Sequence, residues 1–156
     1  MLPYTFEVFS LDHIVSILVI LFLFIIFLRY NDKIGIEDDS KTFLIVLSIL
    51  MIFLDLSEDV VRVFTGYYSI NKDLPLQLCS IGVYLAAYNL IYRNQTIFNL
   101  IFYWGFVGAT NAILTPDGDL FELRIFFFYS QGYHATLIFA VLWMMIKYHM
   151  RMDYKS

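Results

Sequence analysis

The chain has 156 residues, of which 60% are hydrophobic and only 15% are charged, and its formal net charge is -4 at pH 7. Together with a mean hydropathy of +0.71, this balance is far from that of a soluble domain and predicts a membrane protein. The acidic balance, without a cluster of Lys and Arg, argues against a nucleic-acid partner, and the single cysteine excludes an internal disulfide and a cysteine-only metal site.

A bilayer core of about 30 Å requires roughly 20 mostly apolar residues per helix. The chain can therefore supply about five spans with short loops. We predict an all-α fold, a polytopic membrane helix bundle that forms a single transmembrane domain over residues 1–156. The expected spans are about 13–30, 43–63, 74–92, 96–115 and 121–148.

The first span is an apolar run from Ile14 to Leu28. Its leading segment carries Glu7 and Asp12 rather than basic residues, and no small-x-small cleavage site follows. We therefore predict a permanent helix and not a cleaved signal peptide.

The second span begins as an apolar run and ends in charged turns. Stopping at Leu54 would leave about 18 Å of helix, which is too short to cross, so the charged turns belong to the span. The charged residues recur at i, i+3, i+4 and i+7 and share one face. That face must point into the protein or into water, because a lipid-facing carboxylate costs several kcal/mol. Its members are Asp55, Glu58, Asp59 and Arg62.

The third and fourth spans are joined by a very short link. The third starts near Leu74, with Pro75 in the first turn, and holds the only cysteine, Cys79. In the fourth, small residues at i, i+3, i+4 and i+7 form a face that lets another helix approach closely. That small-residue face consists of Gly105, Gly108, Ala109 and Ala112. We expect a second face of this span to point toward the polar groups of the other spans, and it carries Trp104, Gly108, Asn111 and Thr115.

The fifth span is long enough to tilt. Its first half carries Arg124, Gln131 and His134, and its second half is apolar up to Lys147.

The basic residues fall unequally on the two sides of the predicted bundle. By the positive-inside rule, the N-terminus is outside and the C-terminus is cytoplasmic, in a multi-pass protein of the cell membrane. Seven of the ten Lys and Arg lie on the cytoplasmic side: Arg29, Lys33, Lys41, Arg93, Lys147, Arg151 and Lys155.

This orientation puts polar residues of all five spans at one level, in the outer half of the bundle. We therefore predict a cavity or polar network that opens outward, because ionisable residues inside a membrane are functional candidates. The residues at this level are His13, Asp55 to Arg62, Gln77, Cys79, Ser80, Thr110, Asn111, Thr115, Arg124, Gln131 and His134.

Cys79 is the candidate nucleophile at this level, because a thiolate attacks carbonyl carbon and can carry an acyl group as a thioester. A base would come from another helix, and His13 and His134 lie at the right depth. The alternative for Cys79 is a small buried hydrophobe, and a histidine can likewise serve packing alone.

The charged face of the second span is the stronger polar signal. Its three acids against one arginine leave up to two uncompensated charges, which must be protonated, meet water or bind a cation. The alternative is an internal ion-pair network. The candidate substrate-binding residues are Asp55, Glu58, Asp59, Arg62, Gln77, Asn111, Thr115, Arg124 and Gln131, and no metal site or cofactor is expected.

Three motifs follow one another along the chain, with His13 in the first helix. They are Leu74-Pro75-Leu76-Gln77-Leu78-Cys79, then Gly108-Ala109 with Ala112-Ile113-Leu114-Thr115-Pro116, then Phe126-Phe127 to Ser130-Gln131-Gly132. In these motifs the chain resembles the YwaF-like family of bacterial integral membrane proteins, which has a distant eukaryotic branch of membrane acyltransferases acting on ether phospholipids.

The resemblance implies that Cys79 is the residue that carries the acyl group. The family has a histidine where this chain has Gln131, and His134, one turn on, is the stand-in. Relatives continue for one or two further helices, so we expect a C-terminally short member or a chain that needs a partner.

The leading hypothesis is an integral membrane protein that binds or transfers a lipid acyl group through Cys79, as a cysteine-dependent lipid acyltransferase. One alternative is a small-solute transporter or binding protein that uses the charged face of the second span, although no internal repeat is visible. Another is a non-catalytic membrane assembly subunit. The expected partners are membrane lipid and either a second copy of the chain or a partner membrane subunit.

Overall fold

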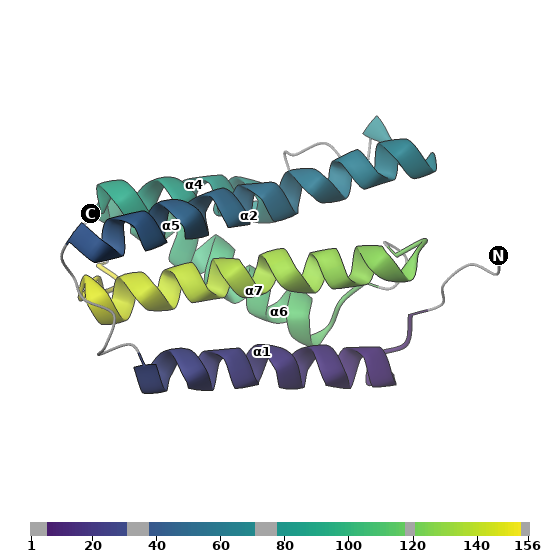
Figure 1. Ribbon diagram of the computed structural model, residues 1–156, viewed down its shortest axis with the longest axis horizontal. Coiled ribbons are helices and arrows are strands. Elements are labelled where there is room, and N and C mark those ends of the chain that lie inside the picture. Colours follow the sequence, from purple (N-terminus) through teal and green to yellow (C-terminus); the bar gives the residue numbers. More distant parts are fainter. Residues whose placement is uncertain (1–5, 31–37, 71–77, 118–120, 154–156) are drawn as a thin grey trace.

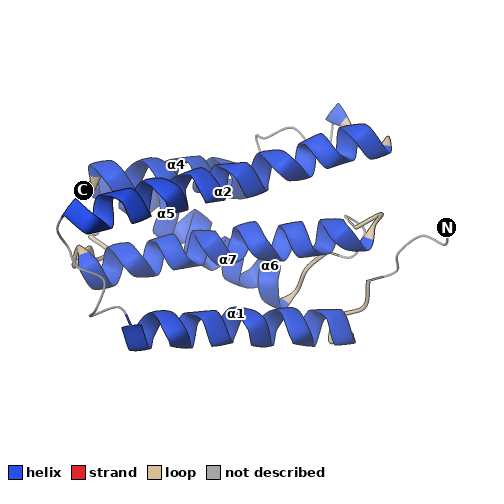
Figure 2. Cartoon of the chain, in the orientation of Figure 1, coloured by secondary structure: helices blue, strands red, loops and turns tan. Residues whose placement is uncertain are grey.

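The computed structural model describes residues 6–30, 38–70, 78–117 and 121–153, and every regular element in this part of the chain is helical (Figure 2). The all-α prediction is therefore confirmed. The long helical segments are α1 (Leu11–Tyr30), α2 (Asp38–Thr65), α4 (Leu78–Tyr92), a composite segment of α5 (Gln95–Ile101), η2 (Phe102–Val107) and α6 (Gly108–Leu114), and α7 (Arg124–Lys147).

Three of these segments are long and apolar enough to cross a membrane: Leu11–Tyr30, Gln95–Leu114 and Arg124–Lys147. The apolar helix Cys79–Tyr92 is shorter, and α2 carries the charged residues of its second half. Each predicted span overlaps one of these helical segments, and the start of the third span, 74–77, lies outside the described residues. That α2 and α4 also cross, and that the N-terminus faces outward, stay predictions.

Helix α7 is the centre of the bundle. It contacts α1, α2, α4, α6 and η2 (Figure 1). More than half of its most apolar window, 56%, is buried inside the protein, whereas the corresponding share of α1 is 22%. A helix that is buried on most of its circumference belongs to the core, so α7 positions the others and α1 covers one side.

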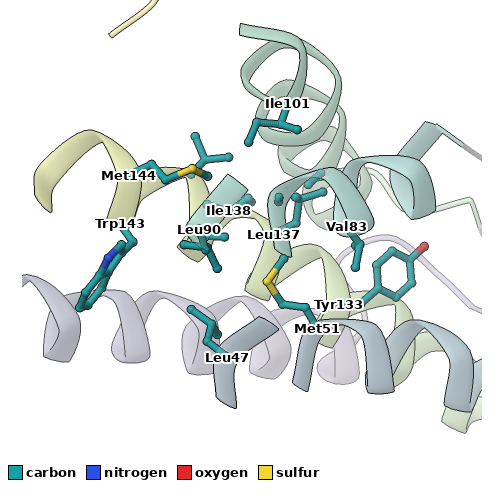
Figure 3. Packing of buried hydrophobic residues seen from close by; sticks show 14 of the residues in the cluster. Leu47, Met51, Val83, Leu90, Ile101, Tyr133, Leu137, Ile138, Trp143 and Met144 are labelled. Atoms are coloured by element: carbon teal, nitrogen blue, oxygen red, sulfur yellow. The ribbon is translucent and has the colours of Figure 1, made fainter. Parts of the chain in front are cut away.

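The apolar core lies where α2, α4 and the composite segment meet α7. Met51, Val83, Leu137 and Met144 have no exposed surface there (Figure 3). In a bilayer such packing relies on close contact between side chains, because lipid tails are as apolar as the core. The contact is closest at Gly105, where an added Cβ would lie 3.3 Å from the Leu137 side chain.

Helices α4 and α7 run side by side in the same direction with a constant register. Gly82 faces the Leu137 side chain, and the Asn89 Nδ2 atom donates to Met144 Sδ at 3.3 Å. In both pairs the residue of α7 follows the residue of α4 by 55 positions in the sequence. The same offset puts Cys79 at the level of His134. The third and fifth spans therefore bring the thiol and an imidazole to one depth.

Candidate functional site

The candidate site lies at the end of the bundle that holds the N-terminal ends of α1, α4 and α7 and the C-terminal end of α2, which we call the polar end. Arg62 of α2 is buried there and is held by two carboxylates. Its Nε and Nη2 atoms lie 3.1 and 3.0 Å from Glu58 Oε1, and its Nη1 atom donates to Glu122 Oε2 at 2.8 Å. The guanidinium also lies 4.1 Å from the centroid of the Phe126 ring. These bonds satisfy the buried cation and tie α2 to the start of α7.

The charged face of α2 points into the bundle, which is one of the two directions, protein or water, that we predicted for it. Asp55 and Arg62 are each 6% exposed, and Glu58 and Asp59 are half-buried. Asp55 is not part of the Arg62 cluster, because its Oδ1 atom accepts a hydrogen bond from Ser80 Oγ of α4 at 3.0 Å. The carboxylates of α2 and the residue beside Cys79 thus meet at the polar end.

Arg124 lies apart from the other polar residues of α7. Its side chain is 63% exposed, and its Nε atom donates to Asp12 Oδ2 of α1 at 2.7 Å. We expected Arg124 to share a cavity with Gln131 and His134, but these two are buried. The three residues separate because Arg124 stands in the first turn of α7, where the surface is within reach.

His13 is hydrogen-bonded at both ring nitrogens and links α1 to the end of α6 through Nε2. The Phe9 N–H donates to Nδ1 at 3.0 Å, so Nδ1 is unprotonated and Nε2 carries the proton that it donates to the Ile113 carbonyl at 2.8 Å. That carbonyl is one of the last in α6, which have no partner within their own helix. A ring that is engaged at both nitrogens would have to break a bond to act as a base.

His134 has the opposite arrangement. Its Nδ1 atom lies 2.7 Å from the Ser130 carbonyl oxygen, which can only accept, so Nδ1 carries the proton and Nε2 has a free lone pair. Nε2 is buried and has no hydrogen-bond partner among the described residues. This tautomer can accept a proton at Nε2 without losing an existing bond.

Gln131 lies three residues before His134, on the same side of α7. Its side chain is 3% exposed, and neither Oε1 nor Nε2 has a partner within the described part of the chain. Buried polar groups without partners cost about 1–3 kcal/mol each and are uncommon. The two side chains therefore form a buried face with open hydrogen-bonding capacity.

Cys79 is a free, half-buried thiol at the polar end of α4. It packs against the apolar core and lies within electrostatic range of Asp55 and Tyr133. Gln77, which we expected beside it, lies outside the described residues. Over the described ranges, no three His, Cys, Asp or Glu side chains are grouped to hold a metal ion.

The polar face predicted for the fourth span was wrong. Trp104 is 44% exposed, and Asn111 and Thr115 are also exposed. These residues do share one side of the segment, but it points away from the bundle, because the opposite side, with the small residues Gly105 and Ala109, is the buried one. The buried positions recur every four residues at Ile101, Gly105, Ala109 and Ile113, which confirms the small-residue prediction at Gly105 and Ala109.

Sequence reasoning missed Glu122 and the difference between the two histidines. Glu122 follows the turn at Pro116 and Asp117, and its one sequence signal was a carboxylate just before an apolar span. The predicted polar cavity stays a prediction, and the cavities described below are apolar.

A comparison with protein families finds a match to the model of the TMEM164 family over residues 8–156. No curated protein and no solved structure matches the chain.

Proposed function

Because the chain belongs to the TMEM164 family, a family of membrane proteins, we propose that it is a multi-pass protein of the cell membrane that transfers a lipid acyl group through a thioester on Cys79. The observation that supports this proposal most is the Nε2 atom of His134, which is open to accept a proton. His134 lies on α7, which packs against α4, the helix that holds Cys79. The register of α4 and α7 puts the two residues at one level. A thiol needs a base to become a nucleophile, and that base must have a free lone pair.

In the first half of the reaction, His134 Nε2 takes the proton of the Cys79 thiol. The thiolate sulfur attacks the ester carbonyl carbon of a lipid, so an S–C bond forms and the C–O bond of the ester breaks. The proton held by His134 passes to the oxygen of the leaving lipid.

In the second half, a hydroxyl group of an acceptor lipid gives its proton to His134, and its oxygen attacks the thioester carbon. The S–C bond breaks, and the sulfur takes back the proton. Proximity within one buried site makes each step effectively intramolecular.

Hydrogen bonding leaves His134, but not His13, a ring nitrogen that is open to accept a proton. Protonating His13 at Nδ1 would break the bond from Phe9 and leave that N–H unsatisfied. We therefore assign proton transfer to His134 and helix joining to His13.

The resemblance of the Cys79 motif to YwaF-like bacterial proteins and to their distant acyltransferase branch supports the same chemistry. Gln131 stands at the position of the family's histidine, so His134 would serve in its place. This substitution makes His134 the residue on which the proposal depends most.

The charged face of α2 gives weaker support to transport of a cationic solute. Arg62 already pairs with Glu58 and Glu122, and Asp55 accepts from Ser80, so we propose that these groups join helices. Exposed Asn111 on α6 supports contact with a further membrane helix, from a second copy or a partner subunit, because an amide facing lipid is costly.

The test uses purified protein in vesicles that contain a phosphatidylcholine with an alkyne-tagged sn-2 chain. We expect a protein-bound label that neutral hydroxylamine removes, as a thioester requires. Cys79→Ser should abolish the label, whereas Ser80→Ala, the neighbouring substitution, should retain it. A label that survives Cys79→Ser refutes the thioester.

A further inference from the structure

One apolar cavity lies on each side of α1. The α1–α2 cavity, about 370 Å³, lies between α1, α2 and α7, and the α1–α6 cavity, about 270 Å³, lies between α1, η2, α6 and α7. Ile20 and Phe24 line both, Leu23 lines only the first, and Leu21 lines only the second. Helix α1 therefore rests on the bundle with space along both of its edges.

The chemistry of these walls selects an apolar occupant. Phe106, Ile113 and Ile138 line the α1–α6 cavity, and an apolar cavity stays dry because water finds too few partners there. Leu21, at the edge, is 50% exposed, toward the region that bilayer hydrocarbon would occupy. A hydrocarbon chain can thus enter sideways from the membrane.

Gln131 lies on α7 beyond the residues that line the α1–α6 cavity, toward the polar end. Gln131, Ile138 and Leu142 recur at i, i+7 and i+11 and so follow one stripe along α7, and the last two line this cavity. Among the described residues, the buried amide of Gln131 has no partner for its donor or its acceptor.

The α1–α2 cavity lacks a comparable feature among the residues that line it. Two hydroxyl groups line it: that of Thr136 already donates to the Tyr133 carbonyl at 2.8 Å, and that of Tyr30 lies at the C-terminal end of α1, away from the polar end. An acyl chain with a carbonyl at its end therefore matches the α1–α6 cavity better than the larger one.

We propose that the α1–α6 cavity binds the acyl chain of a membrane lipid, with the Gln131 Nε2 atom donating a hydrogen bond to the ester carbonyl. This role rests on the proposed function, because it puts the carbonyl one turn from His134 and near the level of Cys79. Gln131 then fixes the carbonyl, and the cavity sets how long a chain the protein accepts.

The experiment separates binding from chemistry by using Cys79→Ser protein, which can bind a chain but cannot form the thioester. The protein is placed in phosphatidylethanolamine and phosphatidylglycerol vesicles with a phosphatidylcholine that carries a diazirine at the end of its sn-2 chain. After photolysis, adducts are mapped by peptide mass spectrometry. We expect them on residues 17–24 and 106–114.

Two substitutions on α1 form a matched pair, because Leu21 and Leu23 are 50% and 55% exposed and each lines one cavity. Leu21→Trp should lower these adducts by about tenfold, the change that about 1.4 kcal/mol produces, while Leu23→Trp should leave them unchanged. Leu114→Trp narrows the same cavity from α6 and should repeat the loss if Leu21→Trp fails to fold.

Substitution of Gln131 tests the carbonyl contact. Gln131→Met keeps the side-chain size and removes the hydrogen bond, so cavity adducts should fall several-fold. The proposal is overturned if the adducts decrease only in Leu23→Trp. It is also overturned if no variant changes the adducts, as expected for labelling by surrounding lipid. Cavity labelling in Cys79→Ser protein together with an acyl label that survives Cys79→Ser would refute the proposed function and leave this inference standing.

Discussion

Replacing Arg62 with methionine tests whether the charged cluster at the end of α2 holds the bundle together. The Arg62 side chain is 7% exposed and donates three hydrogen bonds to Glu58 and Glu122. Removing one partner of a buried ion pair costs about 3–5 kcal/mol, because the remaining charge stays desolvated. The Glu122 side chain is 29% exposed and can rehydrate. We therefore expect the free energy of unfolding to fall by an amount near the lower end of this range, about 3 kcal/mol.

The assay is equilibrium unfolding in mixed micelles, followed by helical circular dichroism as the fraction of denaturing detergent rises. Arg124→Met is the matched control, since it makes the same chemical change in an ion pair whose arginine is 63% exposed. Exposed ion pairs contribute about 0.2–1 kcal/mol. The free energy of unfolding should therefore fall far more for Arg62→Met than for Arg124→Met.

Equal losses in the two variants would refute the view that the Arg62 cluster is a buried structural network. Adding Glu58→Gln to Arg62→Met should return part of the lost stability, because it removes one unpaired negative charge. If the double variant is less stable than Arg62→Met, the cluster is not held by charge pairing.

Two further predictions concern packing and helix joining. Gly105→Ala should lower the free energy of unfolding by about 1–2 kcal/mol, because its Cβ would lie 3.3 Å from the fully buried side chain of Leu137. Gly108→Ala, with nothing within 4 Å, should be neutral or stabilising, and equal losses in the same unfolding assay would contradict the close contact. His13→Leu should cost about 1–3 kcal/mol for each of the two backbone groups that it leaves unsatisfied, and an unchanged unfolding midpoint would show that His13 does not join α1 to α6.

Composition and helix geometry were enough to predict the helical fold and that the charged face of α2 points into the protein or into water. The positions of the apolar runs follow from the bilayer thickness, and burial of Asp55 and Arg62 follows from the cost of a charge in lipid. Bilayer thickness and the cost of a charge in lipid both act on a single segment of the chain, so these features do not depend on the neighbouring helices.

The details of the site depended on contacts that local sequence does not contain. Glu122 reaches Arg62 across 60 residues of chain, and the two histidines differ because one meets a backbone N–H and the other a carbonyl. The outward direction of Asn111 follows from the packing of the opposite side of its segment, at Gly105 and Ala109, inside the bundle. Such contacts are properties of the fold, which is why the first two features were missed and the third was predicted wrongly.

Stability and function make opposite demands on Gln131 and His134, and their joint replacement measures the conflict. Leucine at both positions removes three buried polar atoms that have no partner within the described residues, and each such group costs about 1–3 kcal/mol. The hydrogen bonds that are lost are those of His134 Nδ1 with the carbonyl and hydroxyl oxygens of Ser130. We therefore expect the free energy of unfolding of the double variant to be unchanged or to rise by about 1–2 kcal/mol. The double variant should also lose the thioester label. A destabilised double variant would mean that both side chains are already bonded, for instance through buried water, and that their open atoms are not a site for substrate.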